Sequence, residues 1–257
     1  MTRRRFYAPP EAFAPDGSEV ALSAEETRHL RDVLRVRAGE EVSVFDGEGR
    51  EFACVVAGAP ARGRGATARL EVLKPAEPPS PESPLELTLA VALLKGEKFD
   101  LVVQKATELG ASRVVPVATR RSDVRLRDAR DAEARAERWR RLALEAAKQC
   151  GRARLPAVEG PAALGAFLSR PARGDELRLF FAERGGAPLA GPPGGGVESP
   201  AAVTALVGPE GGWDEEEISE AQARGWRAVT LGGRVLRAET AAIVVAALLQ
   251  HLYGDLV

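Results

Sequence analysis

The chain has 257 residues and a formal net charge of −1, with 45% hydrophobic and 28% charged residues. This composition is typical of a globular protein and allows one large domain or two small ones. No apolar run approaches the roughly 20 residues that a membrane-spanning helix needs, and the basic start MTRRRFYAPP lacks the apolar core of a secretory signal. Cys54 and Cys150 are too far apart for metal-ligand spacing, so we expect no metal site, reduced thiols and a cytoplasmic location.

The charges are distributed unevenly along the chain. Residues 113–154 contain thirteen Lys or Arg and six Asp or Glu, whereas every charged residue between positions 210 and 220 is acidic. Such asymmetry concentrates a positive field on one face even when the total is nearly zero. The basic stretch is either a surface for an anionic partner or a solvated helix surface with internal ion pairs.

The first 75 residues predict a small, mostly β module with the fold of a barrel. A short helix over residues 25–33 has Ser23 as its expected N-cap. Strands are expected over residues 41–46, 51–57 and 67–73, because apolar and polar residues alternate there. The sequence Asp46-Gly47-Glu48-Gly49 has the residue types of a hairpin turn between the first two of them.

A proline-rich segment, KPAEPPSPESP over residues 74–84, has the composition of a linker. Prolines lack the N–H group that a helix interior or a central strand requires, so neither is expected there. We therefore predict a first domain over residues 1–75, a linker over 76–84 and a second domain over 85–257.

The second domain alternates between strands and helices. Strands are expected at 85–93, 113–117, near 155, at 177–181, 202–207 and 228–231, and helices at 97–109, 128–150, from 162, at 214–224 and 239–253. Residues 185–200 form a low-complexity loop. This alternation predicts a parallel sheet with helices on both faces, an α/β fold. Ligands of such sheets bind beyond the carboxyl ends of the strands.

Two glycine-rich loops follow expected strands at that kind of position: ALVGPEGG at residues 205–212 and LGGRVLRAETAA at residues 231–242. Glycine allows a close approach of the backbone to a ligand. Neither loop has the Lys followed by Ser or Thr of a phosphate loop, and the first is acidic, so it favours a neutral or cationic ligand. Taken alone, the first loop is also compatible with a tight strand-to-helix turn in which Asp214 is the N-cap.

Further motifs occur in order along the chain. They are RRFY at 4–7, HLRDVLR at 29–35, Lys95-Gly96, QKATELG at 104–110, Arg138-Trp139 and EAAKQCGR at 145–152. Together with the two glycine loops, this series resembles the bacterial 16S rRNA uridine-N3 methyltransferase family RsmE, of the SPOUT class. The chain departs from the family pattern at Lys148, where an acidic residue is usual, and at Gly233, where proline is usual.

The resemblance implies a PUA-like β-barrel for RNA docking and a trefoil-knotted α/β methyltransferase domain. It implies methylation of N3 of a specific uridine in 16S rRNA, with S-adenosylmethionine as the methyl donor. The partners implied are 16S rRNA or the 30S subunit and a second copy of the chain in a homodimer, with no membrane and no DNA. Two alternatives stay open: an enzyme of the same class that acts on another RNA or base atom, and a non-catalytic RNA-binding assembly factor.

The resemblance also implies roles for individual residues. Arg237 would stabilise charge on the uridine oxygens, unless it is a surface ion-pairing residue, and Glu210 would act as a base or orient the cofactor, unless it caps a loop N–H group. The residues implied in cofactor binding are Phe181, Val207, Gly208, Pro209, Glu210, Gly211, Leu231, Gly232, Val235, Leu236, Arg237, Thr240 and Ala241.

RNA contacts are expected from basic and amide side chains. Arginines with neighbouring aromatic residues in an N-terminal arm suit phosphate contact and base stacking, although such an arm is also compatible with a disordered terminus. Gln149 and Arg152, three residues apart, would share one helix face. The residues expected to bind RNA are Arg3, Arg4, Arg5, Arg120, Arg121, Gln149 and Arg152.

Overall fold

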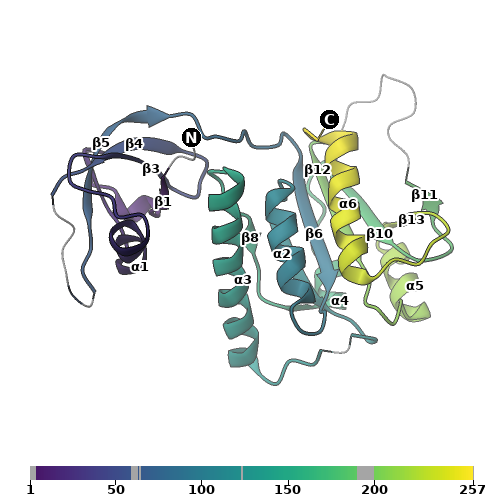
Figure 1. Cartoon of the computed structure of the whole chain (residues 1–257). Helices are drawn as coiled ribbons and strands as arrows, with labels where there is room; N and C mark the ends of the chain where they lie inside the picture. Colours follow the sequence, from purple (N-terminus) through teal and green to yellow (C-terminus); the bar gives the residue numbers. More distant parts are fainter. Residues whose placement is uncertain (1–3, 59–62, 64, 123, 190–199, 257) are drawn as a thin grey trace. The chain divides into compact units, whose positions relative to one another are not determined.

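The computed structural model describes residues 4–58, 63, 65–122, 124–189 and 200–256 (Figure 1). Its contacts divide the chain into two compact units. The N-terminal unit comprises residues 1–82 and 147–155, and the C-terminal unit comprises residues 83–146 and 156–257. The N-terminal unit is therefore assembled from two separate stretches of chain.

A curled, five-stranded sheet forms most of the N-terminal unit (Figure 1). Its strands are ordered β1-β3-β4-β5-β2, with β1 parallel to β3 and the other neighbours antiparallel. The elements are β1 (Arg5–Tyr7), β2 (Glu19–Ala21), β3 (Glu41–Phe45), β4 (Glu51–Val56) and β5 (Arg69–Ala76), with a 3-10 turn (Pro10–Ala12), α1 (Ala24–Arg28) and a π-helical turn (His29–Val33).

Local residue chemistry accounts for the first helix and the first hairpin. The hydroxyl of Ser23 accepts a hydrogen bond from the backbone N–H of Glu26 at 3.2 Å, so the predicted N-cap is confirmed. In the turn between β3 and β4, Asp46 Oδ1 accepts the backbone N–H groups of Glu48 and Arg50. Gly47 in this turn has a φ of 81°, which favours glycine.

The curled sheet encloses a core of its own. Phe6 on β1 and Val20 on β2 stand at opposite ends of the strand order, yet both belong to one buried cluster with Val44, Cys54 and Leu70. Burial raises the pKa of the Cys54 thiol to about 12. The thiol is therefore kept protonated and inert at neutral pH.

The expected linker begins later than its composition suggests. Strand β5 continues through Lys74 and Pro75 to Ala76, and Pro75 stands opposite Phe52 in the pairing with β4. The other neighbour of β5, strand β2, pairs with it only between Arg69 and Glu71. Proline is tolerated at this point because that edge of the strand needs no N–H donor.

An eight-stranded, all-parallel sheet forms the C-terminal unit, in the order β11-β13-β10-β12-β6-β7-β8, with β9 beside β7. The predicted parallel α/β sheet is thus confirmed. Its strands are β6 (Glu86–Ala92), β7 (Arg113–Ala118), β8 (Ala157–Val158), β9 (Ala162–Ala163), β10 (Leu177–Phe181), β11 (Ala187–Pro188), β12 (Ala202–Val207) and β13 (Arg227–Thr230). The helix expected from residue 162 begins after β9, at Leu164.

In the described chain, four helices connect these strands: α2 (Lys98–Glu108), α3 (Ala129–Cys150), α4 (Leu164–Leu168) and α5 (Glu215–Ala223). A further helix, α6 (Ala238–Tyr253), follows the last strand. None of the helices in the described part of the chain combines the length and apolarity that a membrane crossing requires. Helix α5 starts with a capping box in which Asp214 and Glu217 exchange side-chain and backbone hydrogen bonds.

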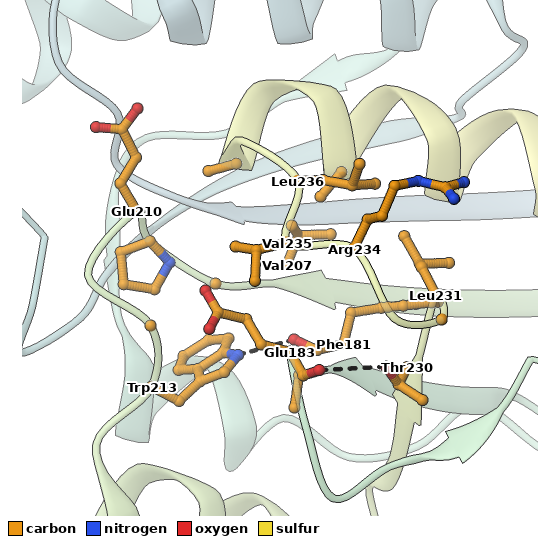
Figure 2. Close-up of a pocket in the computed structure, with 17 residues that line it drawn as sticks. Phe181, Glu183, Val207, Glu210, Trp213, Thr230, Leu231, Arg234, Val235 and Leu236 are labelled. Atoms are coloured by element: carbon orange, nitrogen blue, oxygen red, sulfur yellow. Dashed lines mark hydrogen bonds between the residues drawn. The ribbon is translucent and has the colours of Figure 1, made fainter.

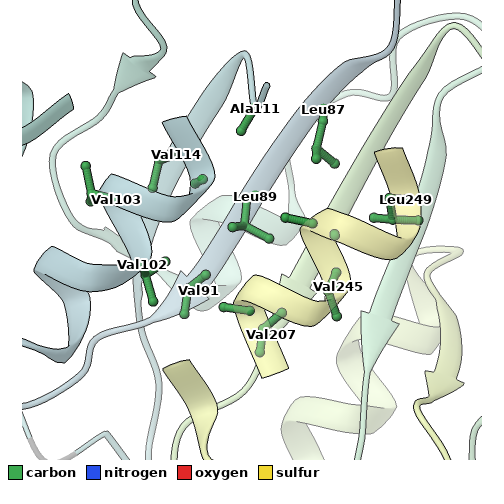
Figure 3. Close-up of a cluster of buried hydrophobic side chains, with 14 of the residues drawn as sticks. Leu87, Leu89, Val91, Val102, Val103, Ala111, Val114, Val207, Val245 and Leu249 are labelled. Carbon is green, nitrogen blue, oxygen red and sulfur yellow. The ribbon is translucent and has the colours of Figure 1, made fainter. Parts of the chain in front are cut away.

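Side chains alternate between two cores, one on each face of the sheet. On β6, Leu87, Leu89 and Val91 pack toward α2 and α6 (Figure 3). Ala90 on the same strand belongs to the opposite cluster, with α4 and α5. This period of two is what a sheet buried on both faces requires. The central strands are thereby packed on both faces, which fixes where their carboxyl ends lie.

Candidate functional site

A pocket lies where three neighbouring strands end. Strands β10, β12 and β13 are adjacent and parallel, so their last residues, Phe181, Val207 and Thr230, reach the same edge of the sheet. The chain segments that follow them enclose the pocket. Its lining consists of Phe181, Ala182, Glu183, Val207, Gly208, Pro209, Glu210, Gly212, Trp213, Thr230, Leu231, Gly232, Arg234, Val235, Leu236, Ala238 and Ala241.

The pocket has the surface of a small-molecule site. Together with its open mouth it holds about 600 Å³ of space not filled by protein atoms, part of which is open solvent. Apolar side chains of Val207, Leu231, Val235 and Leu236 surround it (Figure 2). Such a surface suits flat, largely uncharged groups, with orientation left to a few polar groups.

Trp213 fixes the first glycine loop against the end of β10. Its indole Nε1–H donates a 2.8 Å hydrogen bond to the carbonyl oxygen of Phe181, and its ring packs on Phe180 at 4.5 Å. A Cβ atom added to Gly208 would lie 2.7 Å from that Nε1 and 2.8 Å from Cε2. Glycine at 208 is therefore required so that the indole can lie against the loop.

Two further glycines take conformations that favour this residue. Gly212 has a φ of 69° and Gly232 a φ of 105°. Gly211, by contrast, does not line the pocket, and a Cβ there would lie 3.2 Å from the Cβ of Arg121. The loop is thus shaped by its own backbone and by the segment that carries Arg121.

Basic side chains neutralise much of the acidic stretch. Glu210 forms an ion pair with Lys98 at the start of α2, and in Figure 2 its carboxylate is directed away from the other lining side chains. Asp214 pairs with Arg120 at 3.1 Å and with Arg121 at 3.5 Å.

Arg120 is tied further to the start of α5. It pairs with Glu216 at 2.5 Å, and its backbone N–H donates to Glu217. Hydrogen bonding and charge attraction from Glu216 raise the pKa of the Arg120 guanidinium. The acidic stretch therefore holds the loop in place, and most of its charge does not face the pocket.

Most of the residues expected to bind a cofactor do line the pocket. Gly211, Arg237 and Thr240 are not among the lining residues. Arg237 is the N-cap residue of α6, between the lining residues Leu236 and Ala238, and its side chain is exposed. Within the described residues, its side chain makes no hydrogen bond or ion pair.

The sequence interpretation missed several lining residues. Thr230 is the last residue of β13, and Glu183 lies two residues beyond the end of β10. Arg234 stands beside the predicted Val235, and Trp213 stands two residues after the predicted Gly211. Their positions at strand ends were the available signal, because strand ends at one edge of a parallel sheet converge. Their side-chain directions could not be derived from the sequence.

The residues expected to bind RNA separate into exposed and buried groups. Arg5 is 8% exposed and donates to Glu51 at 2.8 Å and to the carbonyl oxygens of Ala147 and Lys148, in the last turn of α3. Arg152 is 4% exposed, lies beyond the end of α3 and pairs with Glu82 at 2.8 Å. These two guanidinium groups make their hydrogen bonds and ion pairs within the protein and are not accessible to solvent.

Arg4, Arg120, Arg121 and Gln149 are exposed, and Arg3 lies outside the described residues. Lys148, at the position where the family usually has an acidic residue, pairs with the buried carboxylate of Glu26 at 2.7 Å. No group of three or more potential metal ligands occurs among the residues that the structure describes.

Comparison with known proteins assigns both parts of the chain. Residues 81–250 match the family model of the RNA methyltransferase domain, and residues 22–63 match that of the RNA methyltransferase PUA domain. The fold and the pocket thus define an RNA methyltransferase with a PUA domain. The expected α/β methyltransferase fold with an N-terminal PUA-like domain is confirmed.

Relatives narrow the class further. The ribosomal RNA small subunit methyltransferase E of Synechocystis sp. is 34% identical over 252 residues, which cover 98% of this chain and 78% of the relative. The protein of the same name from Bacillus subtilis is 27% identical, covering 91% of this chain and 92% of the relative. The chain therefore belongs to the ribosomal RNA small subunit methyltransferase E family.

Solved structures agree with this assignment. The ribosomal RNA small subunit methyltransferase E from Neisseria gonorrhoeae, bound to S-adenosylmethionine, is 33% identical, with a TM-score of 0.84 over 99% of this chain and 100% of that one. A methyltransferase from Legionella pneumophila in complex with the same cofactor is 31% identical, with a TM-score of 0.83 over the same shares of the two chains.

Proposed function

We propose that this protein transfers a methyl group from S-adenosylmethionine to N3 of one uridine in the 16S rRNA of the small ribosomal subunit. The observation that carries the proposal is the pocket at the ends of β10, β12 and β13. It lies in a chain that is 31% and 33% identical to two methyltransferases whose structures contain this cofactor. A ribosomal RNA substrate also implies action in the cytoplasm.

The residues of the pocket fit this cofactor. Gly208 lets the indole of Trp213 lie against the first loop, and Gly212 and Gly232 turn the two loops. Loop N–H and C=O groups can hydrogen bond to the edge of an adenine, while the apolar side chains cover its faces. We assign the holding role to Phe181, Val207, Gly208, Pro209, Leu231, Gly232, Val235, Leu236 and Ala241, with Gly211 and Thr240 supporting the loop and the helix.

When bound, S-adenosylmethionine supplies a methyl carbon on a cationic sulfur, and N3 of uridine accepts that methyl group as its proton is lost. Arg237 stands at the rim of the pocket with an exposed guanidinium group. We assign it the stabilisation of negative charge on the uridine oxygens. Glu210, held by Lys98, is assigned to fixing the first loop.

RNA docking is assigned to the exposed basic and amide groups. Arg4, Arg120, Arg121 and Gln149 are accessible, and positively charged side chains that contact phosphates supply affinity without sequence selectivity. We also propose that the active species is a homodimer. Exposed apolar side chains of the C-terminal unit, among them Leu101, Val235 and Leu248, are compatible with that assembly.

The decisive experiment is mass mapping of ribosomal RNA modifications in cells with and without the protein, followed by methylation of undermodified 30S subunits by the purified protein. We expect one additional methyl group at N3 of one uridine. A methyl group on another base atom or on another RNA would contradict the proposed target and favour a methyltransferase with a different substrate. Cofactor binding without any methyl transfer would instead favour a non-catalytic assembly factor.

The trefoil knot implied by the sequence resemblance stays a prediction. Cofactor binding itself is checked by thermal unfolding, because a ligand at 100 times its dissociation constant adds about 2.7 kcal/mol to the stability of the folded protein.

A further inference from the structure

Three ionisable residues line the described pocket: Glu183, Glu210 and Arg234. Glu210 is paired with Lys98 and turned outward, and the guanidinium group of Arg234 also extends away from the other lining side chains (Figure 2). The carboxylate of Glu183, by contrast, is directed toward the middle of the pocket, on the side between Val207 and Trp213 (Figure 2).

The backbone fixes the place of Glu183 while its carboxylate stays available. The carbonyl oxygen of Glu183 accepts a hydrogen bond from the Thr230 hydroxyl at 3.4 Å, and Phe181, two residues earlier, accepts the indole N–H of Trp213. Within the described residues, the Glu183 carboxylate has no hydrogen bond and no ion pair. A carboxylate in such a position can attract a cation that enters the pocket.

We propose that the Glu183 carboxylate faces the sulfonium of bound S-adenosylmethionine and makes the site prefer the methylated cofactor over its demethylated product. This inference rests on the proposed function. Among the lining residues, Glu183 is the one that presents a negative charge to the interior, and the sulfonium is the group whose charge disappears when the methyl group leaves.

The consequence concerns turnover. S-adenosylmethionine and S-adenosylhomocysteine share the adenosine, the ammonium and the carboxylate. Contacts to those parts therefore bind both molecules equally and cannot favour replacement of the product by new cofactor. A carboxylate beside the sulfur attracts only the cationic form. Once the methyl group has been transferred, this attraction is lost, and the product is released more readily than the cofactor.

The test compares the affinities of both molecules for wild type and Glu183→Gln, measured by calorimetry on the purified protein. The substitution keeps the size of the side chain and removes its charge. We expect binding of S-adenosylmethionine to weaken about fivefold, the upper end of what one exposed charge interaction contributes, and binding of S-adenosylhomocysteine to change less than twofold. Glu215→Gln, the same change at an exposed position on α5 outside the pocket lining, is the matched control and should alter neither affinity.

Two results would overturn the inference. Unchanged binding of both molecules would mean that Glu183 is merely solvated, and an equal loss for both would place it beside the ammonium. Failure of the wild-type protein to bind either molecule would instead contradict the proposed function, so the two failures are distinguishable. Melting temperatures of the variants, measured without ligand, confirm that the comparison concerns folded protein.

Discussion

Trp213 donates its indole N–H to the carbonyl oxygen of Phe181 at 2.8 Å and thereby joins the first glycine loop to the end of a neighbouring strand. The two residues are far apart in the sequence, and both line the pocket. The indole is 8% exposed, so its donor would be left unsatisfied if the contact were lost. The shape of the pocket therefore depends on the position of one aromatic ring.

Gly208→Ala should displace that ring. The added methyl group would lie 2.7 Å from the indole nitrogen, closer than such atoms approach in folded proteins. We expect a loss of about 1–3 kcal/mol in stability, as for overpacking in a well-packed interior, and weaker binding of S-adenosylmethionine. Thermal unfolding and calorimetry measure the two effects.

The matched control is Gly233→Ala in the second loop, where an added Cβ meets nothing within 4 Å and φ is not in the left-handed region. It should leave stability and affinity unchanged. Equal behaviour of the two variants would show that the contact between Gly208 and Trp213 does not shape the pocket.

Arg237→Ala should lower the rate of methyl transfer far more than the affinity for the cofactor. The side chain is exposed and outside the pocket lining, so its removal leaves the folded site intact. Loss of one positioned charge-stabilising donor lowers the rate by about 10²–10³. Single-turnover methylation of 30S subunits at saturating cofactor checks this, with Arg234→Ala in the same loop for comparison. A normal rate for Arg237→Ala would show that Arg237 is a surface residue without a role in methyl transfer.

Arg5→Met should destabilise the protein rather than weaken RNA binding specifically. The Arg5 and Glu51 side chains are 6% and 0% exposed, and removing one partner leaves a buried charge, which costs about 3–5 kcal/mol. Arg4→Met is the control, because its pair with Glu40 is about 40% exposed on both sides and contributes about 0.2–1 kcal/mol. Urea unfolding gives both values. If the Arg5→Met protein were as stable as wild type but bound RNA more weakly, Arg5 would be an RNA-contacting residue, as the sequence predicted.

Glu159→Gln should change how the stability of the folded protein depends on pH under acidic conditions. Burial of this carboxyl tends to raise its pKa, but hydrogen bonds from Arg170 and Arg113 outweigh that and hold the pKa below its ordinary value of 4.5. A lowered pKa means that the ionised group stabilises the fold above pH 4.5, and this stabilisation is lost as the pH falls through the lowered pKa.

The melting temperature of wild type should therefore exceed that of Glu159→Gln by a constant margin above about pH 5 and by a shrinking margin below it. Thermal unfolding over a pH series tests this. A margin that stays constant into strong acid would show that the two arginines do not favour the ionised form.

Local patterns predicted most of the secondary structure. The alternation of apolar runs and capped helices located α2, α3, α5 and α6 and every strand of more than two residues in the C-terminal unit, and the caps Ser23 and Asp214 were confirmed. These signals are local because a cap or an apolar run acts within a few residues. The position of the pocket followed equally well, since strand ends of a parallel sheet converge.

Side-chain pairing was the part that the sequence could not supply. Arg5 and Arg152 have the sequence context of a basic surface, yet partners 46 and 70 residues away bury them. Glu210 lies 112 residues from Lys98. Such pairs depend on which strands become neighbours, and that is decided by tertiary packing rather than by spacing. For the same reason the sequence did not single out Glu183, because its proposed role depends on the direction in which its carboxylate points.

The N-terminal unit includes a stretch of chain, residues 147–155, that is synthesised only after residues 83–146 of the C-terminal unit. Arg5 holds the carbonyl oxygens of Ala147 and Lys148, and Glu82 holds Arg152. A deletion or a graft made at the proline-rich segment would therefore separate residues that belong to one folded body. The unit that matches the PUA domain cannot be exchanged as a simple N-terminal segment, and a functional chimera must carry the end of α3 with it.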